Sequence, residues 1–337
     1  MVKKGAIMLS SERVVKTIRN ILRIVLLSIL ALFLSCSSQQ ESERMFTITA
    51  EELQTQKLAY CSDYFSFIGS DDRGLVAFAL DNNRGRDGDS WQAEHFVVLH
   101  DEKTGWQVVN GSGPYYNVTR QLETIPNSPD FSFEGTASTG LRIRSGSNVL
   151  ELRIAPVKIQ IAEKRGLAEY RLGSAEATLI WGARTLTGRV IHEYLFVPAF
   201  NRLTRKYPGL FSDFHGIYVS IQNVGDLYIH KQKSMFFSPL IAKQEGFLFL
   251  NRQGYRLSSL NVSVRKSSFA PGFYRWPARW EGSFAAGLDH YAFTGRITDR
   301  KTISNWMIGG FAMGIVKGSL VSARETWTLY GLGELVI

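Results

Sequence analysis

Most of the chain is built from short segments in which apolar and polar residues alternate. Residues 141–144 read Leu-Arg-Ile-Arg and residues 150–154 read Leu-Glu-Leu-Arg-Ile, so that every second side chain is apolar. A period of two is typical of a β-strand with one buried and one solvated face. The Ser-Gly-Ser-Asn that follows the first segment favours a tight hairpin between the two strands. The chain is therefore expected to fold as antiparallel β-structure.

The same pattern continues to the C-terminus, with segments rich in Val, Ile, Phe, Tyr and Thr separated by Gly, Asn and Asp. The composition, 45% hydrophobic and 20% charged, is that of a folded protein, and 337 residues are enough for two domains. No sequence repeat of short fixed period is visible, which argues against a propeller or a solenoid. We predict an all-β fold of two consecutive antiparallel β-barrels or strongly curved sheets, over residues 46–170 and 171–337.

The N-terminus differs from the rest of the chain in charge and hydropathy. Six Lys or Arg residues and a single Glu precede an apolar run over residues 24–34, which only Ser28 interrupts. This run is shorter than the roughly 20 residues that a helix needs to span a bilayer. A basic segment followed by a short apolar one is typical of an N-terminal signal helix rather than of an anchor helix.

Residues 33–40, Phe-Leu-Ser-Cys-Ser-Ser-Gln-Gln, resemble the lipobox of bacterial lipoproteins, although Phe33 stands where that motif usually has Leu. The resemblance implies a signal peptide over residues 1–35, lipidation of Cys36 and a polar tether over residues 36–45. Acyl chains contribute about 0.8 kcal/mol per buried methylene, so a multiply acylated Cys36 would hold the chain at a membrane. We therefore expect a lipid-anchored protein of the bacterial cell envelope, on the periplasmic side or in the outer membrane. An ordinary secretory signal and an uncleaved helix are the alternatives.

Net charge and cysteine content limit the partners and the redox chemistry. The whole chain carries +9, and the six bases and one acid before Cys36 account for +5, so the remaining body carries about +4. This charge favours a mild attraction to anionic lipid headgroups and argues against nucleic acid as a partner, which requires a strongly basic face. The two cysteines are Cys36 and Cys61. If Cys36 carries lipid, no disulfide supports the fold, and Cys61 is expected to be a buried structural thiol.

Three segments carry a resemblance to a known family. They are residues 75–81, Leu-Val-Ala-Phe-Ala-Leu-Asp, residues 91–95, Trp-Gln-Ala-Glu-His, and residues 185–194, Thr-Leu-Thr-Gly-Arg-Val-Ile-His-Glu-Tyr. Together with the two β units, they resemble the paired lipocalin-like barrels of AttH-like proteins, carotenoid 1,2-hydratases and tocopherol cyclases. The tryptophan-rich opening of that family is absent, and residues 64–67, Tyr-Phe-Ser-Phe, are the nearest aromatic substitute. The resemblance implies lipocalin-like barrels and, in the enzymatic members, hydratase or cyclase chemistry.

Acids within otherwise apolar strands are the candidate catalytic residues. An isoprenoid hydratase or cyclase needs a carboxylic acid whose pKa is raised by apolar surroundings, so that it can protonate an alkene. Glu193 and Glu94 meet this description, and Asp81 is a third such acid. Each Glu has a neighbouring histidine, His192 and His95 respectively, and adjacent residues on a strand point to opposite faces. One member of each pair can therefore face a barrel interior, and a salt bridge or an outward position is the alternative for each acid.

An aromatic cluster near residue 275 is the second candidate site. Its rings, interleaved with arginines, suit contact with an apolar ligand, and the alternative is a stacking and cation–π cluster that seals a barrel end. The six histidines are dispersed without metal-binding spacing, and no phosphate or dinucleotide loop is present, so neither a metal nor a cofactor is predicted. The predicted ligand-binding residues are Trp91, His95, His192, Phe273, Tyr274, Trp276 and Trp280.

These features together predict a membrane-anchored, lipocalin-like protein that binds or shuttles an apolar molecule such as a lipid or an isoprenoid. Its expected partners are membrane lipid, through acylated Cys36, and the apolar ligand itself, and binding is favoured over catalysis. The first alternative is an acid-catalysed isoprenoid hydratase or cyclase that uses Glu193 or Glu94. The second is an envelope polysaccharide-binding module with Trp276 and Trp280 as stacking platforms.

Overall fold

The computed structural model divides into residues 1–44 and 45–337, and everything it describes belongs to the second of these units. No helix among the described residues is long and apolar enough to cross a membrane. The predicted signal peptide, Cys36 and the tether lie outside the described residues and stay predictions. The described residues are 60–87, 90–110, 115–116, 131–136, 139–145, 150–165, 168–197, 212–221, 224–234, 242–270, 274–306 and 309–336.

In these ranges the first half of the body forms one antiparallel sheet, which the alternating sequence predicts. Nine strands follow one path, while β5 pairs with β3 and β9 pairs with β10 at its sides. The strands are β1 (Tyr60–Asp71), β2 (Gly74–Asp87), β3 (Ser90–Asp101), β4 (Gly105–Asn110), β5 (Tyr115–Tyr116), β6 (Phe131–Thr136), β7 (Gly140–Ser145), β8 (Leu150–Ile154), β9 (Ile159–Arg165), β10 (Ala168–Trp181) and β11 (Arg184–Val197).

The second half forms another antiparallel sheet, of nine described strands. The predicted all-β fold with two antiparallel units is thereby confirmed. The strands are β12 (Ser212–Ile221), β13 (Gly225–Ser234), β14 (Ala242–Leu250), β15 (Gln253–Arg256), β16 (Ser258–Ala270), β17 (Tyr274–Ala286), β18 (Asp289–Trp306), β19 (Gly309–Ser322) and β20 (Thr326–Val336).

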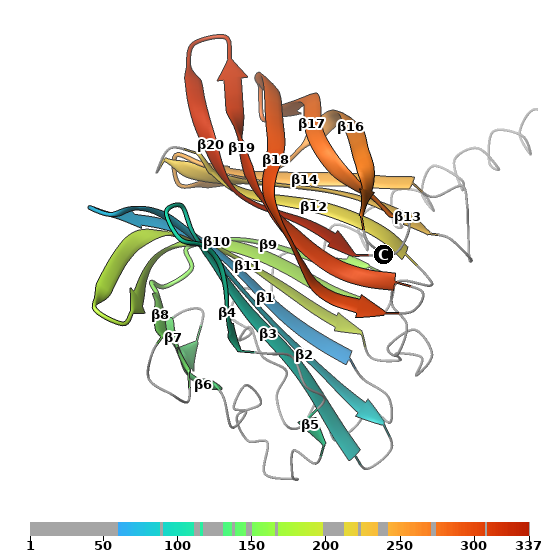
Figure 1. The fold of residues 1–337 in the computed structure, drawn as a ribbon. Helices are drawn as coiled ribbons and strands as arrows, with labels where there is room; N and C mark the ends of the chain where they lie inside the picture. The colour runs from blue at the N-terminus through green and yellow to red at the C-terminus, as the bar shows by residue number, and fades with distance from the viewer. Residues whose placement is uncertain are drawn as a thin grey trace, which may run out of the picture. The chain divides into compact units, whose positions relative to one another are not determined.

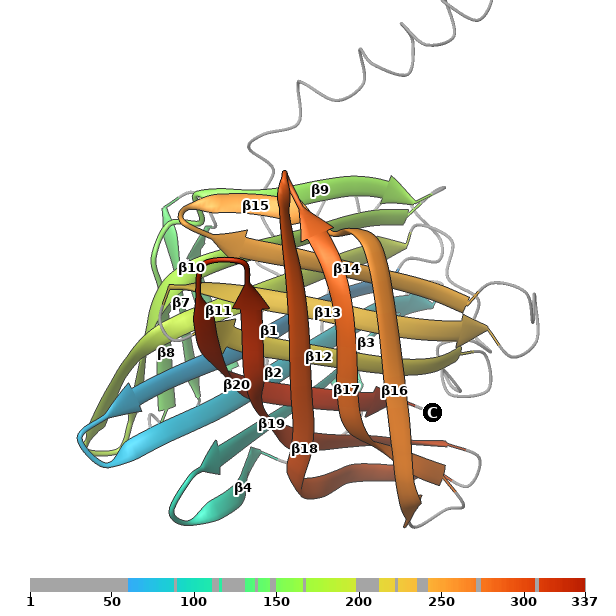
Figure 2. The same cartoon turned by 90° about the horizontal axis from the view of Figure 1, so that it is seen from above.

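The strands of the two sheets follow the same order (Figures 1 and 2). The first runs in the order β4-β3-β2-β1-β11-β10-β8-β7-β6, and the second in the order β15-β14-β13-β12-β20-β19-β18-β17-β16. In each, the last strand returns to pair with the first, as β11 does with β1 and β20 with β12. The first sheet therefore extends to Val197, beyond the boundary placed at residue 170, because β10 and β11 complete it rather than begin the next unit.

Glycines allow the returning strands to lie close to the strands they join. A Cβ atom at Gly188 on β11 would lie 2.0 Å from the carbonyl oxygen of Ile68 on β1. A Cβ atom at Gly331 on β20 would lie 2.0 Å from the carbonyl oxygen of Tyr218 on β12. No side chain fits at such a distance, so glycine is required where each meander returns to its own first strand.

Among the described residues, the alternation along each strand gives three large hydrophobic cores and a small cluster around Trp276. On β1, Phe65 and Phe67 point into a core that the first sheet forms alone, while Tyr64 and Ile68 point toward the second sheet. The second sheet has a core of its own, which includes Trp280. The third, the inter-sheet core, comprises Tyr64, Ile68, Ala77, Ala79, Val98, Tyr170, Leu172, Ile191, Tyr218, Tyr228, Phe247, Phe249, Met313, Ile315, Tyr330 and Leu332.

The side chain of Arg184 forms hydrogen bonds to two aspartates at one end of the first sheet. The guanidinium of Arg184, at the start of β11, donates to both carboxylate oxygens of Asp71 at 2.7 Å and also to Asp101. Asp71 ends β1 and Asp101 ends β3, so one side chain links the ends of three strands. The hydrogen bonds from Arg184 lower the pKa of Asp71 from 3.8 to about 2.

We expect this ion pair to stabilise the fold at neutral pH and to weaken in acid. Because the pKa of Asp71 is depressed on folding, its contribution is complete above the unfolded value of 3.8 and is lost as the pH falls through about 2. Thermal melting from neutral to strongly acidic pH should therefore show a lower melting temperature for Arg184→Met than for the wild type, with a difference that shrinks in acid. A difference that stays constant down to the lowest pH would contradict this assignment.

Candidate functional site

A cluster of acids and tyrosines lies within the inter-sheet core. We call it the acid–tyrosine cluster, and Glu193 on β11 is its best-connected member. The hydroxyl of Tyr218 donates to Glu193 Oε2 at 2.8 Å, and the hydroxyl of Tyr228 donates to Glu193 Oε1 at 3.1 Å. Both tyrosines belong to the second sheet, so the carboxyl group of one sheet is held by hydroxyls of the other. The cluster comprises Tyr64, Asp81, Glu193, Tyr218, Tyr228 and Glu334.

Strand register brings the first-sheet members of the cluster together. Tyr64 on β1 pairs with Glu193 on one side and with Asp81 on the other. Side chains directly opposite on neighbouring strands lie on the same face of the sheet. His192, next to Glu193 in sequence, points to the other face, as alternation along a strand requires. The central strands of the first sheet thus present two acids and a phenol to the second sheet.

The three tyrosines form a stack against this acidic face. The ring centroids of Tyr64 and Tyr218 are 4.7 Å apart, and those of Tyr218 and Tyr228 are 4.6 Å apart. Burial raises the pKa of each phenol well above its usual value of 10, so the hydroxyls remain protonated and act as donors. The Tyr64 hydroxyl is buried and has no hydrogen-bond partner among the described residues. It is therefore available to a molecule that enters the cluster.

Glu334 on β20 is the second acid of the site, and sequence reasoning missed it. Burial, with the nearby charges of Asp81 and Glu193, raises the pKa of Glu334 well above its usual 4.5, and a hydrogen bond with Tyr218 only partly offsets this. Its Oε2 atom is buried and lacks a hydrogen-bond partner within the described part of the chain. This shift favours the protonated form of the carboxyl, which can donate a proton.

Glu193 and Glu334 occupy equivalent places in the two sheets. Each lies on the strand that returns to the first strand of its own sheet. Each also follows a Thr-x-Thr pattern with five residues in between, at positions 185–193 and 326–334. Their cross-strand partners differ, since Glu193 faces Tyr64 and Glu334 faces Gly216. The repeated Thr-x-Thr pattern is the sequence signal by which Glu334 could have been found.

A buried ion pair joins the two sheets next to the cluster. Arg189, four residues before Glu193 on the same face of β11, donates through Nε to Asp226 Oδ2 on β13 at 2.8 Å. Its Nη2 donates to the hydroxyl of Ser174 at 2.7 Å, and that hydroxyl donates to Asp226 in turn. Two charges that are mutually hydrogen-bonded and largely buried fix the sheets in one register, because sliding would leave each charge without its partner.

The structure separates the other predicted site residues from this cluster. His192 faces the first core, where Nε2 lies 2.8 Å from Asp63 Oδ1 and the ring stacks on Phe65 at 4.1 Å. Trp280 is fully buried in the second core, and Trp276 is 5% exposed beside Ala312 and Leu335. Neither indole is exposed as a stacking platform for a sugar would have to be.

Several predicted residues cannot be placed. Phe273 lies outside the described residues, and so do the side chains of Trp91, Glu94, His95 and Tyr274. Asp81, the third predicted acid, belongs to the cluster, where the hydroxyl of Ser62 donates to its Oδ1 at 3.2 Å. Among the side chains that the structure describes, no group of three or more His, Cys, Asp and Glu could hold a metal ion.

The hydroxyls of Tyr218 and Tyr64 should differ in what they contribute to stability. Tyr218→Phe removes a buried donor to a carboxyl group, so we expect a loss of about 1.5–3 kcal/mol in the free energy of unfolding. Tyr64→Phe removes a hydroxyl that has no described partner, so we expect little change or a small gain. Urea unfolding of both variants measures the difference. Equal losses would show that Tyr218 does not hold Glu193 as described.

Comparison with known proteins supports the fold. No protein-family model matches the sequence, and no curated protein sequence matches it. Among solved structures, kievitone hydratase from Nectria haematococca is similar with a TM-score of 0.56 at 10% identity, over 82% of this chain and 88% of that one. A protein from Nitrosomonas europaea that is described as an AttH is similar with a TM-score of 0.55 at 9% identity, over 84% of this chain and 93% of that one. At these identities the likeness is one of fold, and the body of the chain has the paired lipocalin-like fold of these two proteins.

Proposed function

We propose that the chain is an enzyme that transfers protons on an apolar, unsaturated substrate bound between the two sheets, in the manner of a hydratase or cyclase. The observation that carries this proposal is the proximity of two partly buried acids, Glu193 and Glu334, beside the apolar inter-sheet core. The sequence alone favoured a binding protein, with catalysis through Glu193 as the alternative. The cluster favours catalysis, because burying two acids lowers the stability of the fold. A protein that only carries apolar molecules does not need these acids.

Glu334 is the proton donor in this proposal. Burial raises the pKa of its carboxyl, and one carboxyl oxygen is buried without a partner among the described residues, so this group can protonate a carbon–carbon double bond. Protonation leaves a carbocation on the substrate. The faces of Tyr64, Tyr218 and Tyr228 carry the negative side of the aromatic quadrupole and stabilise that positive charge.

Glu193 is the proton acceptor. In a hydration, it removes a proton from the water molecule that attacks the cation, and in a cyclisation it removes a proton from the carbon next to the cation. Its two tyrosine donors hold the carboxyl group in one orientation. Tyr218 hydrogen-bonds to both acids, so it offers a path by which the proton returns from Glu193 to Glu334 after turnover.

The similar folds support this class of reaction. One of the two similar structures is named as a hydratase. Its 10% identity shows a shared fold alone, so the proposal depends on the acid–tyrosine cluster and not on that name.

A second candidate is the binding or shuttling of an apolar lipid or isoprenoid without chemistry. The apolar walls of the inter-sheet core favour it, since such walls suit an apolar guest.

Deuterium transfer distinguishes the two functions even while the substrate is unidentified. We expect the protein, incubated in D₂O with a lipid extract of the native host envelope, to produce a species that carries deuterium on carbon, detected by mass spectrometry. Glu193→Gln and Glu334→Gln should each lower the rate of this transfer by about 10²–10⁴-fold. The rate should also fall as the pH rises through the raised pKa of Glu334, because the acid must be protonated.

Glu325→Gln is the matched control, because Glu325 is exposed in the turn between β19 and β20. It should retain the wild-type rate. A ligand that co-purifies with the protein and gains no deuterium on carbon would establish the carrier function instead. Full transfer by the Glu193→Gln and Glu334→Gln variants would remove these acids from the mechanism.

We also propose that the enzyme is held at a membrane of the bacterial cell envelope by acyl chains on Cys36. The lipobox-like sequence supports this anchor, and lipid at Cys36 would place an enzyme for apolar substrates beside the bilayer in which such substrates dissolve. The inter-sheet site and the anchor are independent proposals, since neither requires the other.

Replacing Cys36 tests the anchor. We expect the wild-type protein to sediment with the membrane fraction of the native host and to gain the mass of acyl chains on its N-terminal peptide, whereas Cys36→Ser should lose both. Cys61→Ser serves as the control because it removes the other cysteine of the chain. Membrane association that survives in Cys36→Ser without acyl mass would contradict lipid anchoring.

A further inference from the structure

Four cations stand in a line across one face of the second sheet. In the register of β16 to β19, Arg265 pairs with Arg279, Arg279 with Arg296, and Arg296 with Lys317. We call these four residues the basic row. Their sequence neighbours Val264, Trp280, Ile297 and Val316 belong to the second core, so the basic row points to the opposite face of the sheet. That face packs against the first sheet at β19, where Lys317 contacts Glu102, and carries the exposed side chains of Arg265, Arg279 and Arg296 on β16 to β18.

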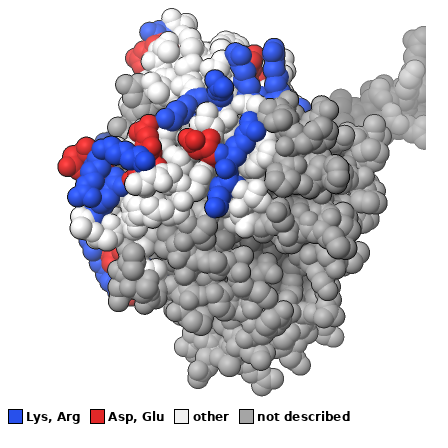
Figure 3. Space-filling view, viewed as in Figure 1, with Lys and Arg blue, Asp and Glu red and all other residues white. Residues whose placement is uncertain are grey.

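The basic row is exposed and only partly neutralised. The side chains of Arg265, Arg279 and Lys317 are 72%, 55% and 50% exposed. Glu281 lies 2.5 Å from Arg279 and 3.9 Å from Arg265, and Glu102 of the first sheet lies 2.9 Å from Lys317. Arg296 has no ion pair among the described residues. Two acids thus face four cations, and Lys and Arg side chains gather over the part of the surface that the second sheet forms (Figure 3).

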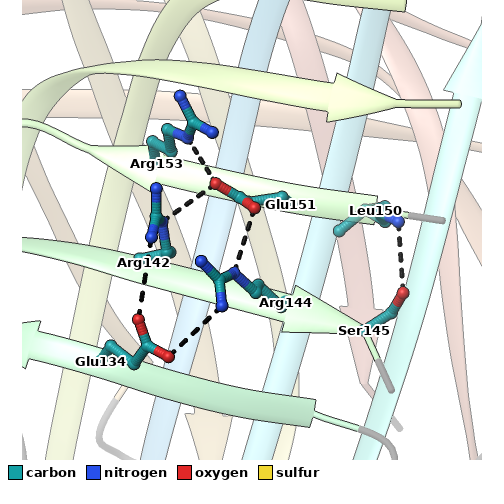
Figure 4. Close-up of polar contacts among 7 residues, drawn as sticks. All are labelled: Glu134, Arg142, Arg144, Ser145, Leu150, Glu151 and Arg153. Atoms are coloured by element: carbon teal, nitrogen blue, oxygen red, sulfur yellow. Dashed lines mark hydrogen bonds and ion pairs between the residues drawn. The ribbon is translucent and has the colours of Figure 1, made fainter. Parts of the chain in front are cut away.

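The corresponding face of the first sheet is built differently. Strands β6, β7 and β8 hold the places that β16, β17 and β18 hold in the second sheet. There acids lie among the arginines, as Glu134 pairs in register with Arg142 and Glu151 with Arg144, while Arg142 also stands opposite Arg153 (Figure 4). Glu151 also contacts Arg142 and Arg153. Each arginine of this face has an acid beside it, so its charge is satisfied within the protein.

Like charges directly opposite on neighbouring strands destabilise a sheet. Neighbouring strands lie about 4.8 Å apart, so the cations of the basic row repel one another. The spacing of these cations is comparable to the size of a lipid headgroup. In the next row of the same face, Ser263, Thr294 and Ser319 add hydroxyls that can bind phosphate oxygens, and Glu281 lies between Ser263 and Thr294. A small anion can bridge two of these cations at a time, whereas an array of phosphates can contact several of them.

We propose that the basic row docks the protein onto a membrane surface rich in anionic phospholipid. The sheet face is lined with exposed cations and hydroxyls, and the chemistry complementary to it is that of phosphodiester headgroups. The interaction is electrostatic and peripheral, so it is distinct from the anchor at Cys36 and from the site between the sheets. It sets which face of the body meets the bilayer.

Vesicle binding by paired variants tests this proposal. The full chain with Cys36→Ser, so that no acyl chain contributes, is measured against phosphatidylcholine vesicles with and without an equal amount of phosphatidylglycerol. We expect binding to the anionic vesicles alone and, at about fivefold per cation, about 30-fold weaker binding by Arg279→Gln/Arg296→Gln. Arg142→Gln/Arg153→Gln removes the same charge from the neutralised face and should bind as the unmodified chain does.

The control shares the N-terminus of the test variant, so a difference between the two reports the basic row alone. Equal loss in both double variants, or equal binding to neutral and anionic vesicles, would overturn the proposal. Dextran sulfate, a soluble polyanion, provides the second comparison. If Arg279→Gln/Arg296→Gln loses affinity for dextran sulfate but not for anionic vesicles, the row binds a soluble polyanion and the membrane assignment is wrong.

Discussion

The hydrogen bonding of the last strand of each sheet to its first strand determines where the functional groups meet. Because β11 returns to β1, Glu193 is brought beside Tyr64 at the middle of the first sheet. Because β20 returns to β12, Glu334 reaches the middle of the second. The two sheets pack face to face, and this packing brings both acids and the tyrosine stack to one apolar region. If either return pairing were lost, its acid would lie at a sheet edge and reach water.

The site is a destabilising arrangement for a folded protein. A buried polar group costs stability unless it is hydrogen-bonded, and a buried charge costs more. The cluster offsets part of this cost through the tyrosine hydroxyls on Glu193, but Glu334 and Tyr64 retain buried oxygens without described partners. By contrast, the charges of Arg184, Asp71 and Asp101 are all paired with one another. We assign these three residues no chemical role. The ion pairs of Arg184 are thus complete, whereas the acid–tyrosine cluster, like several other buried groups of the described residues, retains polar atoms without partners.

Local sequence pattern was enough to predict the strands and the two-unit architecture and to single out Glu193 as a candidate, because alternation and an acid in an apolar strand are visible within ten residues. The partners of Glu193 were not visible, since Tyr218 and Tyr228 come from another sheet and only tertiary packing joins them. The end of the first sheet at Val197 was not visible, because a hairpin that closes a sheet has the same alternation as one that opens it. Aromatic density does not distinguish a binding surface from a core, and Trp280 packs in the second core.

One chain that carries the same architecture twice differs from a dimer of identical halves in what its centre can contain. A symmetric dimer must present the same side chain from both sides, so two facing acids would share one environment and one proton affinity. Here the strand opposite one glutamate supplies a tyrosine and the strand opposite the other supplies a glycine. Because both halves belong to one chain, the two positions are free to have different surroundings. The two glutamates can therefore differ in proton affinity, which a symmetric dimer does not allow.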